Sequence, residues 1–218
     1  MSEDNGAACA LAAVVLAAGL STRFGTANKL LADCAGVPVL ERTLTALAES
    51  RIRSEDCVVV TGADHEQLSV IAARLGMRAA FCPDYADGMG RSLAFGVTGI
   101  AKACDGLLVL PGDMPSMTPE VINRVVAAFE SAAAQQIVFA ATSDGGQSHP
   151  VAWPARCHAQ LTKLGGTRGG KALMSGDILP VIAVPIDDPS ALDDVDTEFD
   201  LARHVARFSP PSVSRESH

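Results

Sequence analysis

Two short loops carry residues that could act on a phosphorylated ligand. The loop Leu16–Gly25 is rich in small residues and holds Arg23, and Lys29 follows it. No acidic residue stands between positions 11 and 32, although the whole chain has a formal net charge of −8. Small residues let the backbone approach a ligand, and its N–H groups can cradle an anion that a guanidinium and an ammonium neutralise. We therefore predict a polyphosphate-binding loop, with an ordinary surface loop carrying solvated cations as the alternative.

The second loop offers a carboxylate at the end of an apolar run. Pro111-Gly112-Asp113-Met114-Pro115 follows residues 105–110, which end in Leu-Leu-Val-Leu. Mg²⁺ usually takes one or two protein carboxylates together with phosphate oxygens and waters. Asp113, held between two prolines, is therefore a candidate metal ligand. The alternative is an aspartate that only stabilises a turn.

Strands that alternate with helices must position both loops. Apolar runs and strand-like segments predict strands at 12–17, 56–61, 78–82, 105–110, 136–142, 151–153 and 177–185. Helical spacing and end signals predict helices at 38–50, 64–75, 118–134, 155–164, 171–175 and 197–208, and a loop leading into a helix at 87–103. This pattern is typical of a Rossmann-like α/β fold with three α/β/α layers and an open, mostly parallel sheet. Ligands bind at the carboxyl ends of such strands, where both loops lie.

Length and composition restrict the class of protein. The 218 residues suit one domain at 10–208, between a flexible N-terminus (1–9) and a disordered tail (209–218) rich in Pro and Ser. The acidic balance argues against a nucleic-acid partner. The apolar run at 10–20 is too short to span a membrane and lacks the basic start of a signal peptide. None of the six cysteines forms a C-x-x-C pair, so we expect reduced thiols and a cytoplasmic location.

The first loop also resembles a known signature. Leu-Ala-Ala-Gly-Leu-Ser-Thr-Arg-Phe-Gly at 16–25, followed by Asn-Lys-Leu-Leu at 28–31, resembles the MobA-like nucleotidyltransferases. Within that family it is most similar to molybdenum cofactor cytidylyltransferase. The resemblance covers roughly residues 10 to 208 and implies a nucleotide-diphospho-sugar transferase-like fold. It also implies that the aspartate of the Pro-Gly-Asp-Met-Pro motif binds a metal.

The resemblance and the two loops together predict the site residues. Arg23, Lys29 and Asp113 are the expected catalytic residues, and Asp196 of Asp194-Val195-Asp196-Thr197 is a second metal contact, with Mg²⁺ as the cofactor. The nucleotide-binding positions are Leu16, Ala17, Ala18, Gly19, Ser21, Gly62, Gly88, Met89, Ser92, Pro111 and Gly112. The acceptor-binding positions are His149, Arg168 and Lys171.

Three positions depart from the family pattern on the acceptor side. Ser148 replaces the Gly of a Gly-His-Pro motif, Thr167 stands where the family has Asp, and Lys171 stands where it has Arg. Because Lys cannot reproduce the bidentate fork of Arg, contacts to the acceptor are expected to differ.

The resemblance implies transfer of CMP from CTP to the phosphate of molybdopterin, with release of pyrophosphate. Ala18 favours the cytidylyl branch, because the guanylyl branch carries Gly there and a methyl group leaves less room beside a base. A molybdoenzyme that receives the product is a further expected partner. The alternatives are a guanylyltransferase of the same cofactor, a cytidylyl- or uridylyltransferase acting on another phosphorylated acceptor, and a non-catalytic accessory protein for a molybdoenzyme.

Overall fold

The computed structural model describes residues 10–209, except for 26, 101–103, 168 and 175–178. The expected flexible N-terminus at 1–9 and all but the first residue of the expected tail at 209–218 lie outside these residues. The five cysteines among the described residues carry free thiols.

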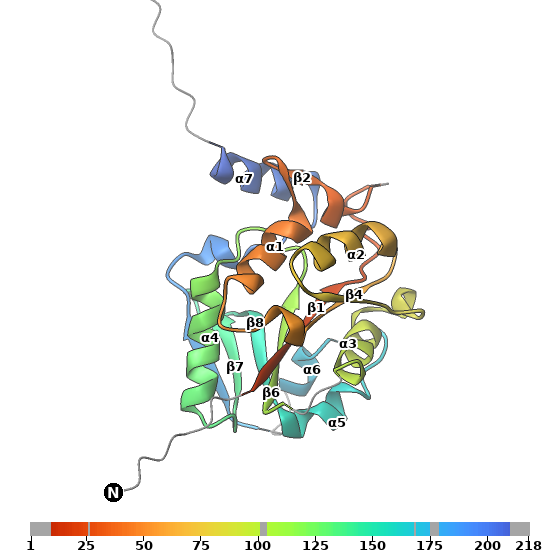
Figure 1. Ribbon diagram of the computed structural model, residues 1–218. Helices are drawn as coiled ribbons and strands as arrows, with labels where there is room; N and C mark the ends of the chain where they lie inside the picture. Colours follow the sequence, from red (N-terminus) through yellow and green to blue (C-terminus); the bar gives the residue numbers. More distant parts are fainter. Residues whose placement is uncertain (1–9, 26, 101–103, 168, 175–178, 210–218) are drawn as a thin grey trace, which may run out of the picture.

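A seven-stranded sheet forms the centre of the molecule (Figure 1). Its strands lie in the order β5 (Arg78–Phe81), β4 (Cys57–Thr61), β1 (Leu11–Ala17), β6 (Gly106–Pro111), β8 (Gln147–Pro154), β7 (Ile137–Ala141) and β9 (Val181–Pro185). All neighbouring strands are parallel except that β8 runs antiparallel to both β6 and β7. A separate hairpin joins β2 (Asp33–Cys34) to β3 (Val37–Pro38).

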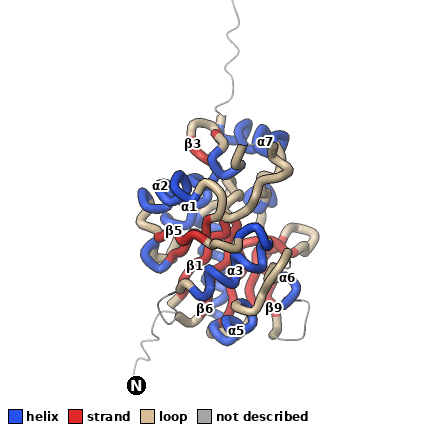
Figure 2. The backbone as a smooth tube through the Cα atoms, turned by 90° about the vertical axis from the view of Figure 1, so that its right-hand side faces the viewer, coloured by secondary structure: helices blue, strands red, loops and turns tan. Residues whose placement is uncertain are grey.

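Helices cover both faces of the sheet, which confirms the predicted three layers. The helices are α1 (Val39–Ala48), α2 (His65–Arg74), α3 (Met89–Thr98), α4 (Pro119–Ser131), α5 (His158–Leu161), α6 (Lys171–Met174) and α7 (Glu198–Phe208). Buried residues of α1, α2 and α4 pack in one core, whereas those of α3 and α5 pack in the other. Figure 1 shows α4 on one side of the strands and α3, α5 and α6 on the other, and Figure 2 shows α3 and α5 in front of them.

Strand β1 shows why the apolar runs predicted the sheet correctly. Ala13 and Val15 face the core of α1, α2 and α4, whereas Ala12 and Val14 face the core of α3. Because both faces are buried, successive residues are all apolar instead of alternating with polar ones. Close packing adds a further requirement: a Cβ on Gly96 of α3 would lie 2.6 Å from a methyl group of Val14.

Two helices begin as their sequences predict. The Thr118 hydroxyl accepts a hydrogen bond from the backbone N–H of Val121 at the start of α4, and Pro119 occupies the first turn. Helix α7 begins with a capping box, in which Thr197 and Asp200 each accept a hydrogen bond from the other's backbone N–H. This cap also fixes the chain that leads into α7.

Three element predictions were wrong in their bounds. Strand β8 begins at Gln147, not at residue 151, because Gln147 pairs with Ala141 of β7 and the ladder includes polar residues that precede the apolar run. The expected helix at 155–164 is a 3₁₀ turn at Ala155–Cys157 followed by the short α5. The strand expected at 177–185 begins only at Val181, and residues 177 and 178 lie outside the described part.

The strand order places the two loops next to each other. From β1 the chain proceeds outward to β4 and β5, then returns to β6 on the other side of β1. The crevice beyond the carboxyl ends of β1 and β6 is therefore the switch point at which such sheets bind ligands. The segment that follows β6 stays next to β1, since the N–H of Gly112 donates a 2.9 Å hydrogen bond to the carbonyl of Leu16.

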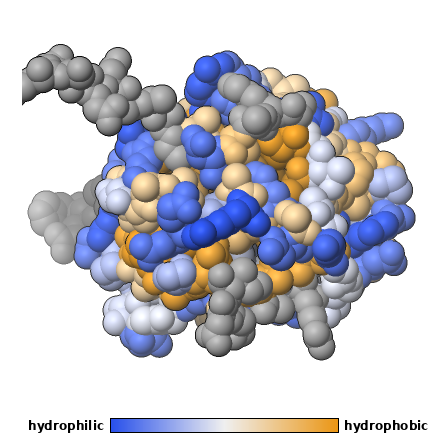
Figure 3. Space-filling model, turned by 90° about the horizontal axis from the view of Figure 1, so that it is seen from below, coloured by the Kyte–Doolittle hydropathy of each residue, from blue (hydrophilic) through white to orange (hydrophobic). Residues whose placement is uncertain are grey.

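The exterior is mixed in polarity. The face seen in Figure 3 intersperses hydrophilic residues with apolar ones. Within the described residues, no helix has the length and apolar character needed to cross a membrane.

Candidate active site

Local hydrogen bonds determine where Lys29 lies after the first loop. The Ser21 hydroxyl accepts a 3.3 Å hydrogen bond from the backbone N–H of Lys29, and Asn28 caps the 3₁₀ turn Lys29–Leu31 by accepting from Leu30. The amide of Asn28 also donates to a carboxylate oxygen of Asp64 at 3.0 Å. The loop is thereby closed on itself and anchored to the start of α2.

The two cations meet the predicted carboxylates in one cluster. The Lys29 ammonium lies 2.6 Å from Oδ2 of Asp113 and 3.0 Å from Oδ1 of Asp196. The Arg23 guanidinium lies 2.8 Å from Oδ2 of Asp196. The Lys29 side chain is only 13% exposed, whereas that of Arg23 is 72% exposed. Residues from both ends of the sequence therefore converge at the carboxyl ends of β1 and β6.

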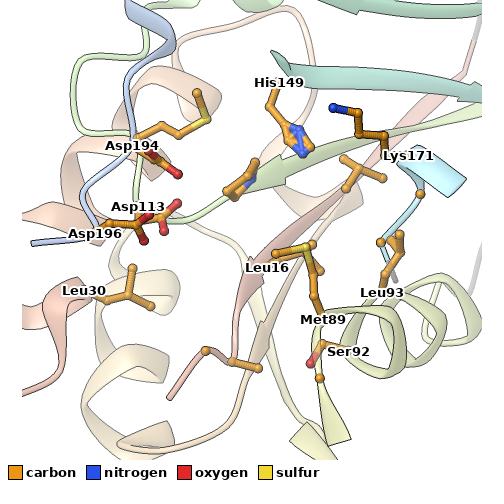
Figure 4. Close-up of a pocket in the computed structure, with 18 of the residues that line it drawn as sticks. Leu16, Leu30, Met89, Ser92, Leu93, Asp113, His149, Lys171, Asp194 and Asp196 are labelled. Atoms are coloured by element: carbon orange, nitrogen blue, oxygen red, sulfur yellow. The ribbon is translucent and has the colours of Figure 1, made fainter. Parts of the chain in front are cut away.

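Asp194 is a third carboxylate of this cluster that sequence reasoning did not assign. Carboxylate oxygens of Asp113, Asp194 and Asp196 all lie within 4.8 Å of one another. The N–H of Val195, between the latter two, donates a 2.9 Å hydrogen bond to the carbonyl of Asp113. The spacing was a usable signal, because residues two apart in an extended segment point to the same side. Figure 4 shows the three side chains together at one end of the pocket.

The cluster has the donor set for a hard divalent cation. Oδ1 of Asp113 is buried and has no hydrogen-bond partner among the described residues. A buried carboxylate oxygen without a partner is costly, and a bound cation would satisfy it. Three oxygen donors at this separation suit Mg²⁺, Mn²⁺ or Ca²⁺ better than soft metals.

The electrostatics of the cluster agree with its geometry. Burial by itself lowers the pKa of Lys29, but the carboxylates of Asp113 and Asp196 outweigh burial and raise the pKa above its ordinary value of 10.5. Partial burial, followed by the negative charges of Asp113 and Asp196, raises the pKa of Asp194. The three carboxylates therefore repel one another, and a cation among them relieves the repulsion.

A cavity of about 710 Å³ extends from this cluster across the end of the sheet. Most of the predicted site residues line it: Leu16, Ala18, Gly19, Ser21, Arg23, Lys29, Gly88, Met89, Ser92, Pro111, Asp113, His149, Lys171 and Asp196. Sequence reasoning missed Tyr85, Leu93, Val109, Val151 and Trp153, which also line the cavity. Of these five residues, all except Tyr85 were predicted only as members of strands and helices.

Four predicted site residues are not among the described residues that line the cavity. Ala17, Gly62 and Gly112 are buried behind it, and Arg168 lies outside the described residues. A Cβ on Gly62 would lie 2.5 Å from the Tyr85 ring, and one on Gly112 would lie 2.9 Å from Leu40. These two glycines therefore permit close packing beneath the site.

Residues at the start of α3 form the wall opposite the cations. Ser92 is 4% exposed, and Met89 is 53% exposed. Gly88 has φ +112°, and a Cβ there would lie 2.6 Å from the carbonyl oxygen of Gly166. The N–H of Gly90 donates a 3.0 Å hydrogen bond to the same carbonyl. The loop containing Gly166 therefore rests directly on this wall.

His149 and Lys171 lie across the cavity from the carboxylates (Figure 4). His149 belongs to β8, and its Nδ1 is buried without a hydrogen-bond partner among the described residues. Burial lowers the pKa of His149 to about 4, so its imidazole is neutral at pH 7.

Comparisons with known proteins identify relatives of this chain. A model of the MobA-like NTP transferase domain family matches residues 13–181. The chain is similar to the purine catabolism protein PucB of Bacillus subtilis, with 29% identity over 207 residues that cover 89% of this chain and 97% of that protein. It is also similar to the molybdenum cofactor guanylyltransferase of Shewanella amazonensis, with 32% identity over 142 residues, or 64% of this chain and 65% of that protein.

Solved structures share the fold. The crystal structure of Rv0371c from Mycobacterium tuberculosis superposes with a TM-score of 0.79 at 24% identity, covering 92% of this chain and 99% of that one. Its complex with manganese gives a TM-score of 0.74 at 23% identity, covering 90% and 98%. Because the family model spans most of the sequence, the chain belongs to the MobA-like NTP transferase domain family and is a nucleotidyltransferase.

Proposed function

We propose that this nucleotidyltransferase moves CMP from CTP to the phosphate of a molybdopterin-type acceptor and releases pyrophosphate. The observation that carries the proposal is the cluster of Arg23, Lys29 and three aspartates at one end of a single 710 Å³ cavity. At the other end lie a neutral His149 and the Lys171 side chain. The cavity thus offers separate places for a triphosphate and for an anionic acceptor.

The residues present fit a divalent cation, and we propose Mg²⁺. Asp113, Asp194 and Asp196 would hold it, and the partnerless Oδ1 of Asp113 is the observation that favours a bound cation. When bound, Mg²⁺ supplies positive charge against the triphosphate and the departing pyrophosphate. The manganese complex of the structural neighbour in Mycobacterium tuberculosis is consistent with a divalent ion on this fold.

The chain's own residues then bind and orient the reactants. An oxygen of the acceptor phosphate attacks the α-phosphorus of CTP in line, the new P–O bond forms, and the bond to the β-phosphate oxygen breaks. A phosphomonoester has a second pKa of about 6, so the nucleophile is already ionised at pH 7 and needs no general base. Arg23 and Lys29 stabilise the negative charge that collects on the leaving pyrophosphate. The backbone from Ala18 to Ser21 positions the nucleotide.

One feature supports a pyrimidine donor. Ala18 lines the cavity, so its methyl group occupies space that a glycine would leave open for a larger base. Ser92 lines the same cavity, and its hydroxyl can hydrogen-bond the edge of a purine or of a pyrimidine, so it does not select between them. The relative from Shewanella amazonensis is named a guanylyltransferase, which makes GTP the main rival donor.

The acceptor side supports a phosphate held by one ammonium. Lys171 supplies a point charge, and His149, being neutral, supplies a hydrogen-bonding ring nitrogen. These contacts would also accept other phosphomonoesters, so sugar phosphates remain comparison substrates.

The experiment is pyrophosphate release by the purified protein with Mg²⁺, each nucleoside triphosphate in turn, and molybdopterin or a sugar phosphate as acceptor. We expect CTP with molybdopterin to give the fastest turnover. Faster turnover with GTP would refute the donor assignment, and faster turnover with a sugar phosphate would refute the acceptor. An Asp113→Asn variant separates an enzyme from an accessory protein: the enzyme loses turnover, whereas an accessory protein binds nucleotide unchanged and had no turnover to lose.

A further inference from the structure

Lys29 occupies the position of a counter-ion within the aspartate cluster. Its ammonium touches Asp113 at 2.6 Å and Asp196 at 3.0 Å, which are two of the three carboxylates that could hold a cation. Among the three described carboxylates of the cluster, the Arg23 guanidinium pairs with Asp196, and it does so from a largely exposed position. Lys29 therefore balances part of the negative charge of the cluster from inside.

This contact conflicts with a divalent cation in the same cluster. Oδ2 of Asp113 is engaged by Lys29, whereas its Oδ1 is buried and has no partner among the described residues. A dication bound to these carboxylates would lie a few ångströms from the ammonium, and like charges at that range repel strongly in a partly buried site. Lys29 can avoid the repulsion only where another anion accepts its hydrogen bonds. A triphosphate at the same end of the cavity is such an anion.

We propose that Lys29 is an exchangeable internal counter-ion, which closes the aspartate cluster until a metal-bound triphosphate arrives and then moves from the carboxylates to phosphate oxygens. This inference rests on the proposed function, because it assumes that metal and triphosphate share this site. It has a definite consequence. The metal alone must compete with Lys29 and binds weakly, whereas the triphosphate removes the competitor, so metal and nucleotide bind with positive cooperativity.

The experiment measures Mn²⁺ binding by electron paramagnetic resonance, in nucleotide-free protein, for the wild type and Lys29→Met. Methionine keeps much of the length of the side chain but removes its charge. We expect the variant to bind Mn²⁺ alone about tenfold more tightly, because the competing charge is gone. We expect it to bind the complex of Mn²⁺ with a non-hydrolysable CTP analogue more weakly than the wild type, by about tenfold, because the phosphates lose a cationic partner. The second value comes from calorimetry.

Opposite changes in the affinity for Mn²⁺ alone and for the Mn²⁺–nucleotide complex distinguish the counter-ion role from a role in folding or in phosphate binding alone. If Lys29 only supported the fold, its loss would weaken both affinities, and if it only bound phosphate, the affinity for Mn²⁺ alone would not change. Either result overturns the inference. Arg23→Met is the matched control, and because Arg23 is exposed and solvent screens its charge, we expect the affinity for Mn²⁺ alone to change less than about threefold.

Two further measurements separate a failure of the metal site, or of folding, from a failure of the exchange. Asp113→Asn should remove Mn²⁺ binding, and if it binds Mn²⁺ like the wild type, the proposed metal site fails rather than the exchange. Should Lys29→Met fail to fold, NMR of lysine ammonium groups in the ¹⁵N-labelled wild type gives the same answer. The Lys29 signal should respond to the Mg²⁺–nucleotide complex far more than to Mg²⁺ at the same concentration, and equal responses would overturn the inference.

Discussion

Lowering the pH from 7 to 5 should destabilise the protein through His149. Its pKa is lowered by burial to about 4 in the folded state, against an ordinary value of 6.5. The unfolded chain therefore binds the proton more tightly than the folded protein does, and stability falls as the pH drops. The contribution of the neutral ring is complete above about pH 6.5 and declines between pH 6.5 and 4.

The size of the effect follows from the two pKa values. Between pH 7 and pH 5 the linkage amounts to about 2 kcal/mol of unfolding free energy for His149 alone. For a chain of this length, each kcal/mol shifts Tm by roughly 2–4 °C, which gives a decrease of about 4–8 °C.

The assay compares Tm at pH 7 and pH 5 for the wild type and His149→Gln. The variant cannot take up this proton, so its Tm should fall by about 4–8 °C less than that of the wild type. Burial also lowers the pKa of His158 and His204, but both residues are present in both proteins and cancel in the difference. Equal decreases in the two proteins, or an NMR titration that places folded His149 near pH 6.5, would refute the reasoning.

Three further predictions concern helix α7 and the cavity. Asp200→Ala removes the carboxylate half of the α7 capping box, which accepts the N–H groups of Thr197 and Asp196. It should therefore cost about 1 kcal/mol by chemical denaturation and weaken Mn²⁺ binding, and an unchanged Mn²⁺ affinity would contradict the second part. Ser116→Ala leaves Nδ1 of the buried His204 without its 2.6 Å partner and should cost about 1–3 kcal/mol of unfolding free energy, whereas a neutral change would show that this contact is dispensable. Ala18→Gly should raise the ratio of GTP to CTP turnover in the pyrophosphate assay, and a ratio that stays constant argues against the methyl group as a selector.

The sheet was predictable because a strand that is buried on both faces has a continuous run of apolar residues in the sequence. The runs at 12–17, 56–61 and 105–110 contain almost only apolar residues and became β1, β4 and β6. Strand β8 was only partly predictable. Its first residues, Gln147 to His149, are polar because they line or border the cavity, and a backbone ladder does not depend on side-chain polarity.

The site was predictable where chemistry dictates residue type. Arg23, Lys29 and Asp113 lie in one cluster with Asp196 as expected, because the loops that follow neighbouring parallel strands meet at one edge of the sheet. Gly62 and Gly112 were assigned to the ligand, but they serve packing behind the cavity, and a short loop sequence does not distinguish the two uses. The walls from Val151 and Trp153 depend on which strands become neighbours, which no local pattern encodes, and Tyr85 belongs to a 3₁₀ turn between the predicted elements.

A crystal structure of the protein with Mn²⁺ and a non-hydrolysable CTP analogue tests the central claim most directly. We expect an anomalous peak from manganese bound by Asp113 and its neighbouring aspartates, with the triphosphate in contact with Arg23 and Lys29 and the base beside Ala18. Manganese elsewhere, or a triphosphate that touches neither cation, would contradict it.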